Sequence, residues 1–238
     1  MNIDNKTAIL TGASGGLGSS IASVLVKNNV KVYGIGRNIY ALHELQSKLG
    51  NNFIPVQLDI TNESKVHNWL NHAISDNNLP DILINNAGVG SFHKVDEMKS
   101  EDWQEMINTN LNGMYYLTAP IVALMKKKNT SSHIINIGSI LGKVGRNNSS
   151  AYCATKFAVQ GFSEALYLEL RAFNIKVTCI NPGSIDTTFF NSSGIQSHKN
   201  MLNPDDIANT LLYLLQTPDN MLINEITIRP MNVMPPSK

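Results

Sequence analysis

The sequence predicts an α/β fold in which a doubly wound parallel sheet of about seven strands is covered by helices on both faces. Short apolar runs alternate with longer segments of helical period along the whole chain, which is typical of strands joined by crossover helices. The apolar runs are nearly continuous, as in strands that are buried on both faces of a sheet. The chain has 238 residues without a repeat or a linker, so residues 1–238 are expected to form a single domain with a short C-terminal tail at 229–238.

The expected elements follow one another in a regular order along the chain. Aliphatic runs predict strands at Lys6–Leu10, Lys31–Ile35, Phe53–Leu58, Asp81–Ile84, His133–Ile137, Ile175–Ile180 and Ile223–Ile228. Apolar residues at helical spacing predict helices at Gly16–Lys27, Asn38–Leu49, Glu63–Ser75, Glu101–Lys127, Ala151–Phe173 and Pro204–Leu215.

Single helices carry their own signals within this pattern. Leu42, Leu45 and Leu49 fall on one face of the second helix, which predicts that this face packs on the sheet. Pro204 stands in the first turn of the last helix, where its missing N–H costs no hydrogen bond. Ligands of open parallel sheets bind beyond the carboxyl ends of the strands, so the residues that follow each strand form the candidate site.

The composition excludes several classes of function. Nineteen basic and eighteen acidic residues leave a net charge of +1, which gives no field to attract nucleic acid or an anionic membrane. No apolar run approaches the roughly 18 residues of a membrane span, and residues 1–6 do not resemble a signal peptide. Two cysteines are too few for a disulfide framework or a structural zinc site. We therefore expect a cytoplasmic protein that binds no metal, nucleic acid or membrane.

A glycine-rich turn follows the first expected strand. The turn leads into the first helix and reads Thr11-Gly12-Ala13-Ser14-Gly15-Gly16-Leu17-Gly18. Gly12, Gly16 and Gly18 would leave room for a diphosphate against the backbone, and the helix N-terminus would offer it free N–H donors. An ordinary tight turn between a strand and a helix can hold the same glycines, so the turn alone does not establish a dinucleotide site.

The residues after the second strand bear on the choice of cofactor. An acidic side chain near this point usually binds the free 2′-hydroxyl of NADH, whereas an arginine accommodates the 2′-phosphate of NADPH. Here Gly36 takes the place of the acid and Arg37 supplies a cation whose fork matches a phosphate. Ser14 could add a hydroxyl. The sequence therefore favours NADPH over NADH, with a solvated Arg37 at the start of a helix as the alternative.

A tyrosine and a lysine stand four residues apart after the fifth strand. Tyr152 and Lys156 would lie on one face of a helix, one turn apart, and Ser139 stands at the exit of the strand. A free tyrosine has a pKa near 10, and acid–base work at neutral pH requires it to fall by about three units, or roughly 4 kcal/mol of preferential stabilisation of the phenolate. A neighbouring ammonium and a cationic nicotinamide can supply this stabilisation. Without the serine and the glycine turn, the pair would be an ordinary feature of a helix.

Together these motifs resemble the short-chain dehydrogenase/reductase family, of the classical type. The resemblance runs from about residue 6 to about residue 230, and it implies a single Rossmann-like domain that binds NADP(H) and transfers hydride between the cofactor and a carbonyl or alcohol. The motifs that carry it, in the order and spacing of the family, are Thr11-Gly12-x-x-x-Gly16-x-Gly18, Asn85-Asn86-Ala87-Gly88, Asn110, Ser139, Tyr152-x-x-x-Lys156 and Pro182-Gly183-x-x-x-Thr187.

The resemblance also implies roles for single residues. Tyr152 would be the general acid in ketone reduction and the base in alcohol oxidation, and Ser139 would hold and polarise the substrate oxygen. Lys156 would lower the pKa of Tyr152 and bind the nicotinamide ribose, while Asn110 would hold a water in a proton relay. The residues implied to contact the cofactor, with Tyr152 and Lys156, are Gly12, Ser14, Gly16, Leu17, Gly18, Arg37, Asp59, Ile60, Asn86, Ala87, Gly88, Ile185 and Thr187.

The end of the chain bears on the substrate. The segment Asn224–Pro230 lacks the Gly-Gly pair of many family members and resembles the branch of NADP-dependent enzymes that act on small hydroxy acids, hydroxy-amino acids and simple carbonyls. A 3-oxoacyl-carrier-protein reductase is the alternative. The short polar stretch Ser192–Asn200 favours a small substrate, which Arg146 or His93 could contact.

Two further expectations come from the resemblance. The long helices at residues 101–127 and 151–173 are expected to form the interface of a homodimer or homotetramer. A non-catalytic redox sensor with this fold would typically have lost the tyrosine or the lysine, and since Tyr152 and Lys156 are both present, we expect an enzyme.

Overall fold

The fold is built on one parallel sheet. The structure is a computed structural model, and it describes residues 1–128, 130–190, 198–232 and 234. Every paired strand in the described part runs parallel to its neighbour, in the order β3-β2-β1-β4-β5-β6-β7. The strands are β1 Thr7–Thr11, β2 Lys31–Gly36, β3 Phe53–Gln57, β4 Ile82–Asn85, β5 Ser132–Ile137, β6 Ile175–Pro182 and β7 Glu225–Ile228.

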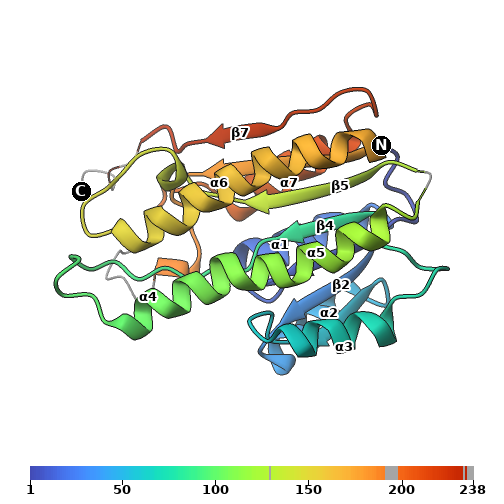
Figure 1. The fold of residues 1–238 in the computed structure, drawn as a ribbon, viewed down its shortest axis with the longest axis horizontal. Coiled ribbons are helices and arrows are strands. Elements are labelled where there is room, and N and C mark those ends of the chain that lie inside the picture. Colours follow the sequence, from blue (N-terminus) through green and yellow to red (C-terminus); the bar gives the residue numbers. More distant parts are fainter. Residues whose placement is uncertain (129, 191–197, 233, 235–238) are drawn as a thin grey trace.

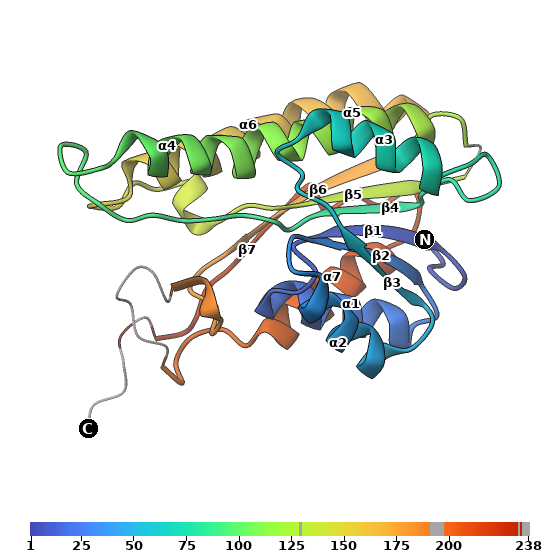
Figure 2. The same ribbon diagram turned by 90° about the horizontal axis from the view of Figure 1, so that it is seen from below.

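Helices cover both faces of this sheet (Figures 1 and 2). One face carries α1, α2 and α7, and the other carries α3, α4, α5 and α6 (Figure 2). Each face has its own apolar core, as expected for a doubly wound sheet. The helices are α1 Gly16–Lys27, α2 Ile39–Leu49, α3 Glu63–Ala73, α4 Ser100–Ile107, α5 Gly113–Met125, α6 Ser150–Leu170 and α7 Pro204–Gln216. The predicted fold is thus confirmed.

Asparagines end and begin many of these elements. The side chains of Asn38, Asn62 and Asn203 accept hydrogen bonds from the first turns of α2, α3 and α7, at 3.2, 3.0 and 2.9 Å. Such caps satisfy backbone donors that a helix start leaves unpaired. Among the described residues, all non-glycine positions with a positive φ are also asparagines, including Asn148 and Asn174. The abundant asparagines therefore define where helices start and where the chain turns.

Two of the predicted helices differ in detail from the structure. The segment predicted as one helix at Glu101–Lys127 contains a π-helical turn at Asn108–Asn112, between α4 and α5, which still share a continuous course (Figure 1). In this turn the side chain of Asn110 is buried and bonded to neighbouring elements, which favours the local widening. The other long helix, α6, ends at Leu170 and continues as one 3₁₀ turn before the left-handed Asn174.

The topology places a crevice at the centre of the sheet. The chain passes from β3 at one edge to β4 beside β1, so the direction of winding reverses between β1 and β4. In open sheets of this kind the ligand binds at that switch point, beyond the carboxyl ends of the strands. Of the predicted substrate-contacting stretch Ser192–Asn200, residues 192–197 lie outside the described part of the chain, as do residues 233 and 235–238 of the tail.

Candidate active site

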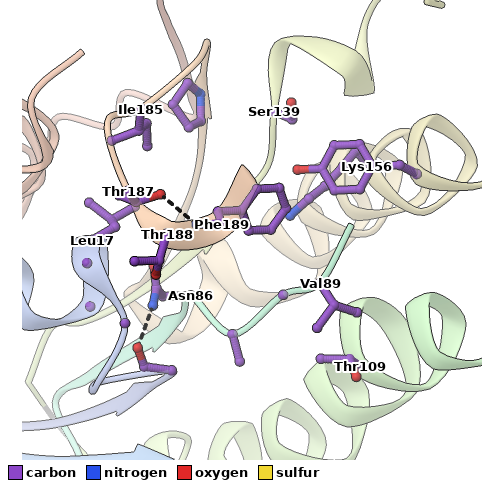
Figure 3. A pocket seen from close by; sticks show the side chains of 18 of the residues that line it. Leu17, Asn86, Val89, Thr109, Ser139, Lys156, Ile185, Thr187, Thr188 and Phe189 are labelled. Carbon is purple, nitrogen blue, oxygen red and sulfur yellow. Dashed lines mark hydrogen bonds between the residues drawn. The ribbon is translucent and has the colours of Figure 1, made fainter. Parts of the chain in front are cut away.

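A cavity of about 510 Å³ lies at the carboxyl ends of the strands. Its size falls in the range of small-molecule and cofactor sites. Figure 3 shows Leu17 and Asn86 on one side of it and Ser139 and Lys156 on the other. Among the residues that line it are Gly12, Ser14, Gly16, Leu17, Gly18, Arg37, Asp59, Ile60, Asn86, Ala87, Gly88, Ser139, Arg146, Tyr152, Lys156, Ile185 and Thr187. Every residue that the sequence singled out for the site is therefore brought together here, except Asn110, which stands behind the wall, and His93.

The glycine turn forms a cradle in which side chains would not fit. Gly12 has a φ of +64°, a conformation that L side chains rarely adopt. A Cβ at Gly18 would lie 2.0 Å from the carbonyl oxygen of Gly12. Unlike α2, α3 and α7, helix α1 has no side-chain cap, and its first turn contains no acidic residue. Its N-terminus therefore presents backbone N–H donors and a positive dipole end to the cavity, which fits the diphosphate of a dinucleotide.

The hydroxyl of Thr11 joins this turn to the end of β4. It accepts hydrogen bonds from the backbone N–H groups of Asn86 and Ala87, both at 3.0 Å, and donates one to the carbonyl of Ile84 at 3.3 Å. In return the Asn86 amide donates to the carbonyls of Thr11 and Gly12, at 2.9 and 3.2 Å. Thr11 is part of the motif quoted from the sequence, but no role was predicted for it. These bonds fix the two sides of the crevice relative to each other.

At one end of the cavity lie the cation of Arg37, the hydroxyl of Ser14 and a glycine, Gly36, at the position where an acidic side chain would bind a ribose. Arg37 is exposed directly after β2 and lines the cavity together with Ser14. The Ser14 hydroxyl lies 3.2 Å from the place where a Cβ of Gly36 would stand, so an acidic side chain at that position would crowd it. Burial raises the pKa of Asp59, but hydrogen bonds from Thr61 and the charge of Arg37 outweigh it and lower this pKa. Arg37 and Asp59 therefore lie within electrostatic reach of each other at this end.

At the other end the structure brings Ser139, Tyr152 and Lys156 together. Tyr152 and Lys156 occupy successive turns of α6 and are both buried, and the Lys156 amine lies 5.7 Å from the centre of the Tyr152 ring. The same amine donates a hydrogen bond to the carbonyl of Ile137 at 2.8 Å. Ser139, buried at the end of β5, caps the following short turn by accepting from the N–H of Leu141 at 3.1 Å.

Burial controls the ionisation of both groups on α6. It raises the pKa of the Tyr152 phenol above its ordinary value, while a hydrogen bond with the Ser139 side chain acts in the opposite direction. It lowers the pKa of the Lys156 amine from 10.5 to about 8. The sequence predicts instead that Lys156 lowers the pKa of Tyr152. The structure differs because removal from water disfavours the charged form of each group, and a phenolate here needs additional positive charge.

Asn110 lies behind Tyr152 and Lys156 and connects two elements of the site. Its amide donates to the carbonyl of Val89 at 2.9 Å and to the hydroxyl of Thr155 at 3.1 Å, and its oxygen accepts from the N–H of Val89 at 2.8 Å. It therefore ties the loop after β4 to α6. A Cβ at Gly88 would lie 3.3 Å from the Asn110 oxygen and 3.8 Å from the Lys156 amine, so both polar groups face the backbone at Gly88.

A chain of hydrogen-bonded polar side chains holds the backbone of Ser139 in place. The sequence did not predict this network. The oxygen of Asn181 accepts from the N–H of Ser139 at 3.1 Å, and its amide donates to Gln160 at 2.8 Å. Gln160 in turn donates to Glu225 at 2.8 Å, which also pairs with Lys143. The signal was present, since Asn181 directly follows the predicted strand Ile175–Ile180, at the end where site residues are expected.

Aromatic side chains line the cavity around Tyr152. The rings of Phe92 and Phe189 lie 5.4 and 5.9 Å from the Tyr152 ring, in tilted arrangements. Phe189 belongs to the segment after β6. The same segment places Thr187 next to the glycine turn, where a Cβ at Gly16 would lie only 2.8 Å from the Thr187 methyl. Figure 3 shows Thr187 and Phe189 along this segment. The result is an apolar chamber next to the phenol.

The described residues contain neither a cluster of metal-ligating side chains nor a membrane-spanning helix. Among them, no three His, Cys, Asp or Glu side chains gather as a metal site would require. No described helix is both long enough and apolar enough to cross a bilayer.

Known proteins resemble the chain over nearly its whole length. The family described as short chain dehydrogenase matches residues 6–197. An uncharacterized oxidoreductase of Staphylococcus aureus is 34% identical over 229 residues, which cover 96% of this chain and 98% of that protein. Among solved structures, the closed form of a serine dehydrogenase complexed with NADP⁺ is 29% identical with a TM-score of 0.85, covering 93% of both chains.

A second solved structure extends the comparison. The 3-ketoacyl-(acyl-carrier-protein) reductase from Brucella melitensis complexed with NADH is 26% identical with a TM-score of 0.88, covering 95% of this chain and 97% of that one. The family match spans most of the chain, and the glycine cradle and the Ser139, Tyr152 and Lys156 cluster lie within it. The chain belongs to the short-chain dehydrogenase family of NAD(P)-dependent oxidoreductases.

Proposed function

We propose that this chain is an NADP(H)-dependent oxidoreductase that interconverts a small carbonyl compound and a secondary alcohol, with residues 1–238 as one catalytic domain. The observation that carries the proposal is the placement of the Tyr152 phenol. It is buried between two aromatic rings, hydrogen-bonded with Ser139 and one helical turn from Lys156, in the same cavity as the glycine cradle.

The reaction divides the work between the cofactor and the side chains. When bound, the nicotinamide ring supplies the hydride that forms the new C–H bond at the carbonyl carbon, and it takes up the hydride in the reverse direction. Tyr152 gives its phenolic proton to the carbonyl oxygen as the C=O double bond opens, and it regains a proton from solvent. Ser139 donates a hydrogen bond to the same oxygen, which stabilises the negative charge that develops there.

Lys156 and Asn110 would support this proton transfer. With a pKa of about 8, the Lys156 amine is largely protonated at neutral pH, so its charge would act together with that of the oxidised nicotinamide to stabilise the Tyr152 phenolate. Lys156 would also bind the ribose next to the nicotinamide. Asn110 would hold a water that connects Lys156 to solvent, since both groups face the backbone at Gly88.

The adenosine end would hold the 2′-phosphate of NADPH. Arg37 would pair with the phosphate, Ser14 would donate its hydroxyl, and Gly36 leaves the space that an acidic side chain would otherwise occupy. The serine dehydrogenase structure that this chain resembles was complexed with NADP⁺, which supports the assignment. Asp59 and Ile60 would contact the adenine, and Ile185 and Thr187 the carboxamide of the nicotinamide.

The substrate class follows from the chamber around Tyr152. Its apolar walls would accept the short carbon skeleton of a small hydroxy acid, hydroxy-amino acid or simple ketone or aldehyde. A 3-oxoacyl-carrier-protein reductase is the second candidate, and the structural similarity to such an enzyme from Brucella melitensis supports it.

We further propose that the protein assembles as a homodimer or homotetramer through α4, α5 and α6. Trp103, Tyr115, Phe157 and Leu168 on these helices are large apolar side chains that are 44 to 55% exposed. Large exposed apolar residues that gather on one face are typical of interfaces. Light scattering at micromolar concentration should give a mass of two or four chains, and a monomer would contradict this assembly.

A turnover panel tests the proposed function. Oxo acids, simple ketones, aldehydes and a 3-oxoacyl thioester are each mixed with NADPH or NADH, and loss of absorbance of the reduced cofactor is followed. We expect NADPH oxidation with at least one small carbonyl and less with the thioester. Cofactor binding without any turnover would instead indicate a sensor, and rapid turnover of the thioester alone would favour the second candidate.

A further inference from the structure

We propose that Arg146 binds the carboxylate of the substrate, so that the natural substrate pair is a small oxo acid and its hydroxy acid. This inference rests on the proposed function and narrows its substrate class. Arg146 lines the same cavity as Tyr152 and Ser139, and it lies between these two residues in the chain.

The distribution of charge in the cavity supports an anionic substrate. Among the described lining residues, Asp59 is the only carboxylate, and it lies at the adenosine end near Arg37. The lining holds two further cations, Lys156 beside Tyr152 and Arg146 on the loop that precedes α6. The Lys156 amine is buried and bonded to a backbone carbonyl. Arg146 is exposed, and it forms no ion pair within the described ranges of the chain. Its guanidinium is thus available to an incoming anion.

The loop that carries Arg146 is anchored at both ends. On one side, the Val144 N–H donates to the carbonyl of Ile140 at 3.2 Å, and Lys143 pairs with Glu225 on β7. On the other side, Ser149 is buried, and its carbonyl accepts from the Cys153 N–H in the first turn of α6 at 2.7 Å. Because its flanks are fixed, Arg146 is presented to the cavity from a defined position, as a specificity residue requires.

The chemistry of the chamber favours a carboxylate on a short carbon skeleton. A guanidinium presents two parallel N–H donors that match the two oxygens of a carboxylate, which fixes both the position and the orientation of the bound acid. The other side chains around Tyr152 are largely apolar, including Phe92, Phe189 and Leu141. Such walls accept a hydrocarbon segment, and binding of the acid by Arg146 would orient its carbonyl carbon toward Ser139 and Tyr152.

Matched pairs of substrates test this inference. The wild-type protein is assayed with NADPH and 2-oxo, 3-oxo and 4-oxo acids, each against its methyl ester, which keeps the skeleton and removes the charge. We expect one acid to exceed its ester in kcat/KM by about tenfold to a hundredfold, as for loss of a charged hydrogen bond. The KM for the acid should rise with salt, because exposed charges are screened, while that for the ester should not.

Variants of the arginine separate its role from general electrostatics. In Arg146→Gln the advantage of the acid over the ester should disappear, with turnover of the ester retained, and Arg146→Lys should keep part of it. Arg171→Gln, which removes the same charge at the far end of α6, should behave as the wild type. Equal kcat/KM for acid and ester in the wild type, or equal loss on both in Arg146→Gln, would overturn the inference. A preference for phosphorylated carbonyls that Arg146→Gln removes would also overturn it, in favour of a phosphate site.

A binding measurement distinguishes this inference from the proposed function. Calorimetry with the NADP⁺ complex and 2-hydroxybutyrate, 3-hydroxybutyrate or 4-hydroxypentanoate should show binding of at least one of these hydroxy acids, and Arg146→Gln should weaken that binding by about tenfold or more. If no carbonyl is turned over but the hydroxy acid still binds through Arg146, the proposed reaction fails and the anion site stands. If neutral carbonyls are turned over and the hydroxy acid binds equally to both proteins, the reaction stands and the role of Arg146 fails.

Discussion

The side-chain amine of Lys156 donates a 2.8 Å hydrogen bond to the backbone carbonyl of Ile137, two residues before Ser139. This bond joins the second turn of α6 to the end of β5. It therefore helps to hold Tyr152 on the helix close to Ser139 after the strand, and this effect does not depend on the charge of the amine. The amine therefore has a structural use in addition to the electrostatic one that we propose. Any variant of Lys156 will disturb both, which makes Tyr152 the cleaner test of the chemistry.

Replacement of the phenol should remove turnover and leave the cofactor site intact. In Tyr152→Phe we expect kcat to fall by about 10³-fold or more, because the proton donor is lost while the aromatic packing with Phe92 and Phe189 is kept. The Kd for NADPH, measured by fluorescence, should change little. Tyr167→Phe on the same helix is the matched control and should keep full activity. Substantial turnover by Tyr152→Phe would exclude the phenol as the proton donor.

The side chain of Asn181 should affect the rate more than cofactor binding. Asn181→Leu removes the acceptor of the Ser139 N–H, and we expect kcat to fall about tenfold or more as the serine loses its orientation. Gln160→Met, which removes the bonds to Asn181 and Glu225 but leaves the Ser139 N–H paired, should have a smaller effect. The two kcat values and the KM for NADPH are compared, and an unchanged kcat in Asn181→Leu would show that this network is purely structural.

Arg37 should set the preference between the two nicotinamide cofactors. In Arg37→Ala the affinity for NADPH should fall by about tenfold to a hundredfold, as expected for a lost charged hydrogen bond, while the affinity for NADH stays nearly the same. Steady-state KM values for both cofactors measure this. Lys31→Ala, an exposed lysine at the other end of β2, serves as the control. Equal loss for both cofactors would place Arg37 outside the 2′-phosphate site.

His133 should make the fold sensitive to acid. It is buried in β5, where its Nε2 lies 2.8 Å from the Thr178 hydroxyl, and burial lowers its pKa from 6.5 to about 3. Between pH 6.5 and pH 3 this histidine binds a proton in the unfolded chain but not in the folded one. The free energy of unfolding should therefore fall as the pH drops through this range. At 1.36 kcal/mol per pKa unit, the loss is at most about 5 kcal/mol. Urea unfolding of His133→Leu should show a flatter acid limb. His72→Gln, an exposed histidine, should follow the wild type.

Two glycines should respond to alanine in opposite directions. A Cβ at Gly18 would lie 2.0 Å from the Gly12 oxygen, so Gly18→Ala should destabilise the fold by about 1–3 kcal/mol and weaken cofactor binding. Gly161 lies inside α6 with open space around its Cβ position, so Gly161→Ala should stabilise the fold by about 0.5–1 kcal/mol. Thermal unfolding measures both changes. A higher Tm for Gly18→Ala would contradict the close packing of the turn.

The sequence predicted the fold well because the relevant signals are local. Most strands are short runs rich in aliphatic residues and most helices have an apolar stripe, so their order along the chain predicted the parallel sheet without any long-range information. The positions of Tyr152 and Lys156 on one helical face followed from their spacing in the same way. The π-helical turn within the predicted helix Glu101–Lys127 contains Asn110, a residue that the family resemblance had already assigned to the site.

Other properties depend on contacts between distant parts of the chain. The pKa of Tyr152 is governed by burial, which depends on residues as far away in sequence as Phe92 and Phe189. The support of Ser139 by Asn181 requires β5 and β6 to pair in one particular register. Strand order and register are not visible in a sequence, so neither effect could be inferred from it.

The π-helical turn at Asn108–Asn112 constrains how this chain tolerates changes of length. A π turn holds one residue more than a turn of α-helix, so deletion of a single residue there would let α4 and α5 merge into one regular helix. Because the wider turn accommodates the extra residue locally, the apolar stripe of α5, including Leu117, Ile121 and Met125, would keep its contact with the sheet. The cost would fall on Asn110, whose bonds to Val89 and Thr155 depend on this turn, so shortening the segment would preserve the helix and disturb the site.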